Sequence, residues 1–95
     1  MEKQILLNVS LVNEKEGGYS AIATDLEVAS QGESVEEALN NLKEAVELYV
    51  ESSVELGIMD QVLERLRISD QDMKEENLIM PKILRTEIPI ALNLQ

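Results

Sequence analysis

The sequence contains neither cysteine nor histidine among its 95 residues. Without cysteine, the chain forms no disulfides and no thiolate metal sites. Without histidine, imidazole acid–base catalysis is excluded, together with the Ser–His and Cys–His nucleophile pairs and most zinc or copper sites. These two absences set the firmest limits on function that the composition provides.

Aromatic and basic residues are also scarce. The chain has no Phe and no Trp, only Tyr19 and Tyr49, so its core must be aliphatic. Nineteen acidic residues against eight basic ones give a formal net charge of −11. A surface this acidic repels phosphate backbones, so we expect no direct nucleic acid binding, whereas a basic protein partner would suit it.

Long hydrophobic runs are missing as well. No apolar stretch approaches the roughly 20 residues of a membrane span. The apolar part of the first twelve residues, MEKQILLNVSLV, is too short for a signal peptide. We therefore expect a cytoplasmic protein without a membrane partner.

Hydropathy alternation predicts the strands. Residues 4–12 place apolar side chains on one face, as a half-buried strand does. A charged connection ending in two glycines leads to a second, antiparallel strand over 18–26. Residues 27–30 then form a brief third strand, which ends at Gln31-Gly32.

A long amphipathic helix follows, with Ser34 and Glu37 predicted to form a Ser-x-x-Glu capping box. At 100° per residue its side chains divide into an apolar and a mainly acidic arc. The apolar arc comprises Val35, Ala38, Leu39, Leu42, Ala45, Val46, Tyr49 and Val50. The opposite arc comprises Glu36, Glu37, Asn40, Lys43, Glu44, Glu47 and Glu51.

The rest of the chain is less regular. Gly57 is a plausible helix stop, and a short second helix is predicted over 59–67. Residues 69–77 are polar and are expected to form a mobile loop. The last segment, 83–95, alternates again and predicts a strand, which Pro89 restricts to a sheet edge.

These elements predict an α+β domain in the order β-β-β-α-α-β, with helices packed on one face of an antiparallel sheet. Residues 1–57 form the core, and residues 58–95 complete the same single domain. The other sheet face needs cover, so we expect a homo-oligomer that forms through the terminal strand. The candidate interface residues are Ile88, Ile90, Leu92 and Leu94.

No catalytic, cofactor or metal residue is assigned, and we expect no enzyme and no cofactor. Asp25 and Glu27 share a strand face, but a two-metal site needs carboxylates from several elements. The glycine patterns of nucleotide-binding loops are missing too.

One set of residues follows a spaced pattern of Tyr-x-Ala, Asp-Leu, Gln-Gly, a Ser cap, Glu-Ala, Asn and a second Glu-Ala. Its members are Tyr19, Ala21, Asp25, Leu26, Gln31, Gly32, Ser34, Glu37, Ala38, Asn41, Glu44 and Ala45. Together they resemble the N-terminal domain of HicB-type antitoxins and their solitary relatives. The resemblance covers roughly residues 3–51, about half of the chain.

The resemblance implies a partial ribonuclease H fold without a working active site. It also implies a partner, because HicB binds HicA, a small basic toxin that cleaves mRNA, and covers its catalytic surface. Two departures stand out. Glu27-Val28 replaces the Pro-Gly of many members, and residues 58–95 do not look like the family's usual DNA-binding domain.

Three functions therefore stay open. The first is a HicB-like protein-binding module that acts as an antitoxin. The second is a solitary structural or regulatory module with a different protein partner. A carboxylate–metal enzyme is the third and most distant.

Overall fold

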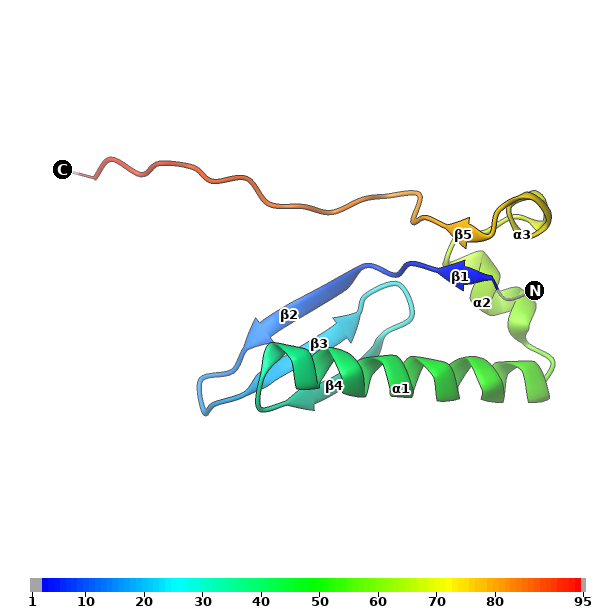
Figure 1. Cartoon of the computed structure of the whole chain (residues 1–95), viewed down its shortest axis with the longest axis horizontal. Coiled ribbons are helices and arrows are strands. Elements are labelled where there is room, and N and C mark those ends of the chain that lie inside the picture. Colours follow the sequence, from blue (N-terminus) through cyan, green and yellow to red (C-terminus); the bar gives the residue numbers. More distant parts are fainter. Residues whose placement is uncertain (1–2, 95) are drawn as a thin grey trace.

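The predicted α+β class is confirmed in a computed structural model, which describes residues 3–94 (Figure 1). A three-stranded antiparallel sheet carries a long helix, and two short helices follow it. The elements are β1 (Gln4–Ile5), β2 (Val9–Asn13), β3 (Tyr19–Ala23), β4 (Val28–Gly32), α1 (Val35–Glu55), α2 (Met59–Arg65), α3 (Asp70–Glu75) and β5 (Leu78–Ile79).

The main sheet has the strand order β2-β3-β4. Its β2–β3 register runs without a bulge from Val9 opposite Ala23 to Asn13 opposite Tyr19. Helix α1 packs mainly over β4 and β3 (Figure 1). Within the described chain only β3 pairs with β2, so β2 forms a free edge of this sheet.

The core between α1 and the sheet is small and built largely from alanine. Buried Ala21 and Ala23 of β3 meet buried Ala38 and Leu42 of α1. Because alanine side chains are short, the helix lies close to the sheet. Partly buried side chains complete this core: Leu7, Tyr19, Val28 and Val46.

Both ends of α1 follow the sequence signals. The Ser34 hydroxyl accepts a hydrogen bond of 3.1 Å from the Glu37 amide. The second bond of a capping box, in which the Ser34 amide would donate to the Glu37 carboxylate, is not among the hydrogen bonds of residues 3–94. Half of the predicted capping box is therefore observed. After the last turn, Gly57 takes φ +71° and the Ile58 amide donates to the Ser53 carbonyl at 2.9 Å.

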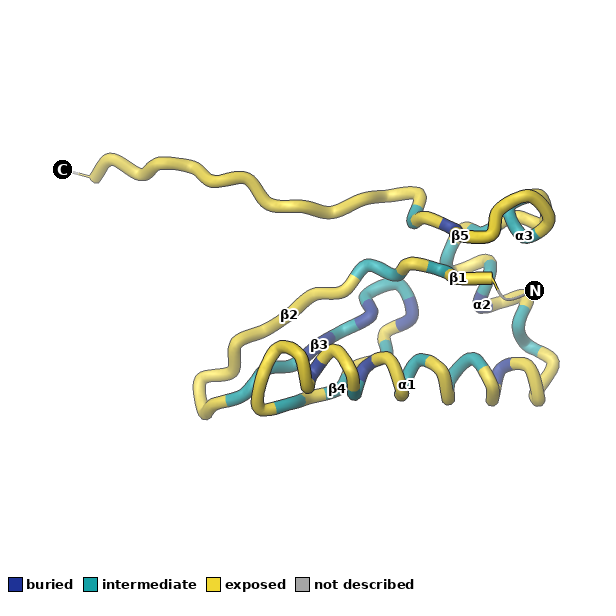
Figure 2. The backbone as a smooth tube through the Cα atoms, viewed as in Figure 1, coloured by how far each residue is buried: buried dark blue, intermediate teal, exposed yellow. Residues whose placement is uncertain are grey.

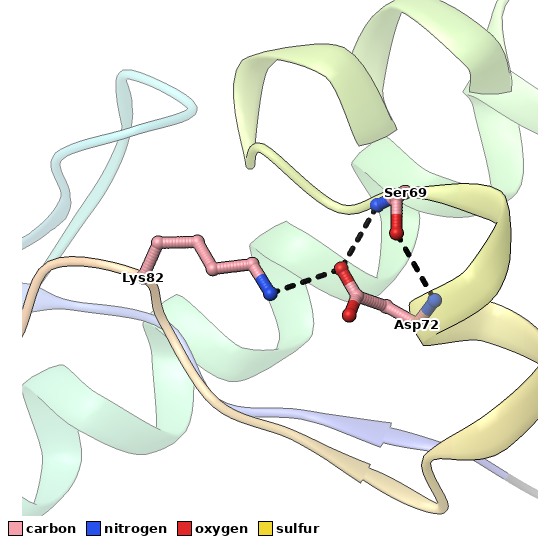
Figure 3. Close-up of polar contacts among 3 residues, drawn as sticks. All are labelled: Ser69, Asp72 and Lys82. Carbon is pink, nitrogen blue, oxygen red and sulfur yellow. Dashed lines mark hydrogen bonds and ion pairs between the residues drawn. The ribbon is translucent and has the colours of Figure 1, made fainter.

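The polar segment after α2 is a helix, not the predicted loop. Ser69 caps α3 through a full capping box. Its hydroxyl accepts from the Asp72 amide at 3.1 Å, and the Asp72 carboxylate accepts from the Ser69 amide at 3.0 Å (Figure 3). The Ser-x-x-Asp spacing carried this signal, but the high polarity of the segment concealed it.

The single strand predicted over 4–12 is also wrong, because it divides into two. Residues 6–8 separate β1 from β2, and β1 pairs in parallel with β5, Gln4 opposite Leu78 and Ile5 opposite Ile79. Only β2 belongs to the three-stranded sheet. The alternation of residues 4–12 is only partial, and it does not indicate where the strand breaks.

The predicted C-terminal strand is not formed within this chain. Residues 80–94 pair with no strand in the part of the chain that the structure describes, and the last strand is β5. We call residues 84–94 the arm and residues 3–83 the body. The arm runs extended away from the body and is exposed along its whole length (Figures 1 and 2). Residue 95 lies outside the described residues.

Candidate protein-binding surface

The strand–helix corner is held by several of the pattern residues. A Cβ at Gly32 would lie against the Ala38 nitrogen and 2.7 Å from the Glu37 carbonyl carbon, so only glycine fits there. The Asn41 side-chain amide donates to the Gln31 carbonyl at 2.8 Å. These residues fix α1 against β4 and serve the fold directly.

The other pattern residues divide between core and surface. Ala21 is fully buried and Tyr19 packs against the core. Asp25 lies in the turn before β4, whereas Glu44 is exposed on α1. Most of the pattern therefore builds the scaffold, and only its carboxylates are placed to meet a partner.

The exposed side of α1 is strongly acidic. Glu47, Glu51 and Glu55 follow one another at the i,i+4 spacing, at which like charges repel. None of them joins either ion pair of residues 3–94, which link Arg65 to Glu27 and Lys82 to Asp72. The exposed carboxylates of this acidic face are Glu36, Glu37, Glu44, Glu47, Glu51 and Glu55.

A shallow hollow of about 620 Å³ continues the acidic face at the start of α1. Glu14 and Glu16 enter it from the β2–β3 turn, and Glu33 and Glu37 enter it from the other side. Among residues 3–94, no group of three acidic side chains is placed to hold a metal ion.

Positive charge collects elsewhere, where the arm leaves the body. A crevice of about 180 Å³ beside β1, β5 and the end of α2 is lined by Arg65, Arg67, Lys82 and Arg85. These are four of the eight basic residues of the chain. Acidic side chains predominate in the hollow, which Lys15 also lines, and basic side chains predominate in the crevice, which Asp25 also lines.

The free edge of the sheet is apolar. All five residues of β2 are exposed, including Val9 (40%), Leu11 (44%) and Val12 (43%). The strand contains no charged residue, no proline and no bulge, the usual features that keep an exposed edge from pairing. The edge is therefore competent to accept another strand.

The predicted interface residues of the arm are also apolar and exposed. Ile88, Ile90, Leu92 and Leu94 are between 69% and 83% exposed, and the structure brings none of them to the body. Their role in assembly stays a prediction. Sequence analysis missed the second half of such an interface, the free edge of β2.

A comparison with protein families decides the relationship of the chain. Residues 7–84 match the family described as "Family of unknown function (DUF7387)". The chain belongs to this family. The match covers almost the whole body and ends at the first residue of the arm.

Two relatives of this DUF7387 member match about half of the chain. One is the UPF0150 protein ssr1765 of Synechocystis sp. (strain ATCC 27184 / PCC 6803 / Kazusa), and the other is a UPF0150 protein of Helicobacter pylori (strain J99 / ATCC 700824). Each is 47% identical over 47 residues, which is 48% of this chain. The chain spans 60% of the first relative and 64% of the second.

No solved structure matches the chain, and the likeness to part of the ribonuclease H fold stays a prediction. Among the described residues, no helix combines the length and the hydrophobicity that crossing a membrane requires.

Proposed function

We propose that this DUF7387 member is a cytoplasmic HicB-like protein-binding module, an antitoxin that neutralises a small basic mRNA-cleaving toxin by covering its active surface. The acidic face of α1 is the observation that carries this proposal. A basic partner is attracted to such a face over long range, which speeds encounter and selects the partner.

The distribution of charge on α1 is unfavourable for the isolated helix. Glu47, Glu51 and Glu55 repel one another, and Glu55 lies in the last turn, where the helix dipole disfavours negative charge. That last turn contains no basic residue. A cationic partner would relieve this repulsion. The clustered carboxylates thus favour binding of a basic partner, whereas they lower the stability of the isolated helix.

The family pattern supports the same function. The residues that resemble HicB build a rigid corner between β4 and α1, and this corner holds the acidic face in place.

One observation favours the alternative of a solitary regulatory module with a different protein partner. After α1 the chain continues into α2, where Val62 is buried, and then through α3 to β5, which pairs with β1. This region adds to the body, whereas the usual antitoxin carries a DNA-binding domain there.

The test is purification of the tagged chain from its native host at low salt, followed by identification of the bound protein. We expect a small basic protein in near-equal amount, whose cleavage of mRNA stops when the purified chain is added back. A stoichiometric partner without ribonuclease activity would favour the regulatory module and contradict the antitoxin proposal.

Charge-neutralising variants then locate the binding surface. Replacing Glu47, Glu51 and Glu55 together with Gln should weaken partner binding by about tenfold or more, which is about 1.4 kcal/mol. The matched control neutralises three exposed carboxylates outside α1, namely Asp60, Glu64 and Asp70. Equal weakening by both triple variants would show that net charge alone matters and that the acidic face is not the binding site.

A further inference from the structure

Two parts of this chain carry exposed apolar surface that the described residues leave uncovered. One is the edge of β2, with an uninterrupted row of backbone donors and acceptors on its outer side. The other is the arm, whose residues 88–94 have no charged side chain and alternate as a strand does. Figure 2 shows both as continuous exposed segments.

The apolar part of the arm, residues 88–94, is too far along the chain to cover the β2 edge of its own body. The Asn8 side-chain amide donates to the Ile83 carbonyl at 2.8 Å, so residue 83 lies beside residue 8, just before β2 begins. The chain enters this point in parallel, as the β1–β5 pairing shows. If the two segments continued in this parallel register, residues 84–88 would lie beside Val9–Asn13.

The apolar part of the arm then falls beyond the end of β2. In that parallel course Ile88 reaches Asn13, the last residue of the strand, and Ile90, Leu92 and Leu94 have no β2 residue beside them. The segment that does pass β2 contains Arg85 and Glu87 and lacks the apolar alternation. The strand-like part of the arm therefore fits an edge on another molecule.

We propose that residues 88–94 of each copy add as a fourth strand to the β2 edge of a second copy, so that two chains exchange arms. The pairing would satisfy backbone groups on both strands and cover Val9 and Leu11 on the face that α1 shares. Residues 84–87 would bridge the two bodies, a reach of roughly 13 Å at about 3.3 Å per residue. Because the exchange is reciprocal, both arms and both β2 edges are occupied in the dimer, and the two-fold arrangement is closed.

Charge makes this association respond to salt in a recognisable way. Each chain carries a net charge of −11, whereas residues 88–94 are uncharged. Two acidic bodies repel each other, so added salt should screen the repulsion and strengthen the dimer. Binding of a basic toxin should respond in the opposite direction, so the two proposals can fail independently.

Light scattering of the intact chain is the first test. We expect a mass twice the 10.6 kDa of one chain, with the dimer fraction rising as salt is added. Replacing Ile88 and Ile90 with Lys should return the protein to a monomer. The matched control replaces Leu48 and Leu56, apolar residues of comparable exposure near the end of α1, with Lys and should leave the dimer intact. A monomeric wild-type chain, or a dimer that survives the arm substitutions, would overturn the proposal.

Cysteine cross-linking identifies the contact, because the natural chain contains no cysteine. Ser10 lies in β2 on the sheet face away from α1, and Ala91 lies on the arm face opposite Ile88, Ile90 and Leu92. The two single variants are Ser10→Cys and Ala91→Cys. A one-to-one mixture of the two single variants should give a disulfide-linked dimer. A cross-link formed by Ala91→Cys alone would indicate arm-to-arm pairing, and a double variant linked at monomer mass would indicate docking within one chain. Either result would overturn the exchange.

Discussion

The body and the arm contrast in how their apolar residues are used. In the body, small side chains such as Ala21, Ala23 and Ala38 are buried almost completely, and α1 lies close to the sheet. In the arm, large side chains such as Leu92 and Leu94 are more than three-quarters exposed. The difference shows that hydrophobicity alone does not locate the core of a small domain. A core needs elements that pack together, and residues 3–83 provide no such element for the arm.

A substitution at the strand–helix corner should destabilise the body more than any other change considered. Gly32→Ala should lower the free energy of unfolding by roughly 3 kcal/mol, because its methyl group would meet the backbone of Glu37 and Ala38. Urea unfolding followed by circular dichroism measures this loss. Gly57→Ala is the control, since a Cβ at Gly57 meets nothing within 4 Å and only the positive φ is strained, at about 1 kcal/mol. Equal losses at the two glycines would contradict the tight corner.

Hydrogen exchange should distinguish the body from the arm in the unmodified protein. Amides of Ala21 and Ala23 should exchange slowly at every protein concentration, because they lie in the central strand. In dilute solution the amide hydrogens of Ile90 and Leu92 should exchange at unprotected rates. At concentrations at which the dimer forms, they should exchange at least about tenfold more slowly. Arm amides that stay unprotected at all concentrations would show that the arm has no partner.

The smallest expected effect concerns the point where the arm leaves the body. Hydrogen bonding from the Ser69 backbone, and then from Lys82 at 3.0 Å, lowers the pKa of the Asp72 carboxyl (Figure 3). A pKa lower in the folded than in the unfolded chain stabilises α3 at neutral pH, and this contribution is lost as the pH falls through the folded value. Asp72→Asn should therefore speed exchange of α3 amides a few-fold at pH 7, and this difference should disappear in acid. A difference that persists at low pH would show that shape, not charge, holds the cap.

Sequence patterns predicted the parts of the fold that are encoded locally. The Ser34 cap of α1 and the stop at Gly57 follow from neighbouring residues, and the structure confirms both. The apolar arc is confirmed in part, because Ala38 and Leu42 are buried whereas Val35 and Leu39 are exposed. The fold class follows from the order of these elements. The strand order and the exposure of β2 do not follow from it, because they depend on how the strands pair and on which strands α1 covers.

Other features had weak or misleading signals. Helix α3 was concealed by the polarity of its residues, and Glu27 and Arg67 adopt positive φ values of 58° and 59° that neither residue type suggests. At the candidate surface, the acidic arc of α1 was predicted directly. The free β2 edge was not, since the partial alternation of residues 4–12 also describes a strand with one buried face.

The proline in the arm has a consequence for how far assembly can proceed. Residue parity places the amides of Ile88, Ile90 and Leu92 on one side of an added strand, and the nitrogen of Pro89, which carries no hydrogen, on the other. An arm that turns its donors toward β2 thus presents an interrupted row to the next molecule. Growth of the sheet would stop after one addition, and a chain with so apolar an end would form a discrete particle instead of a fibre.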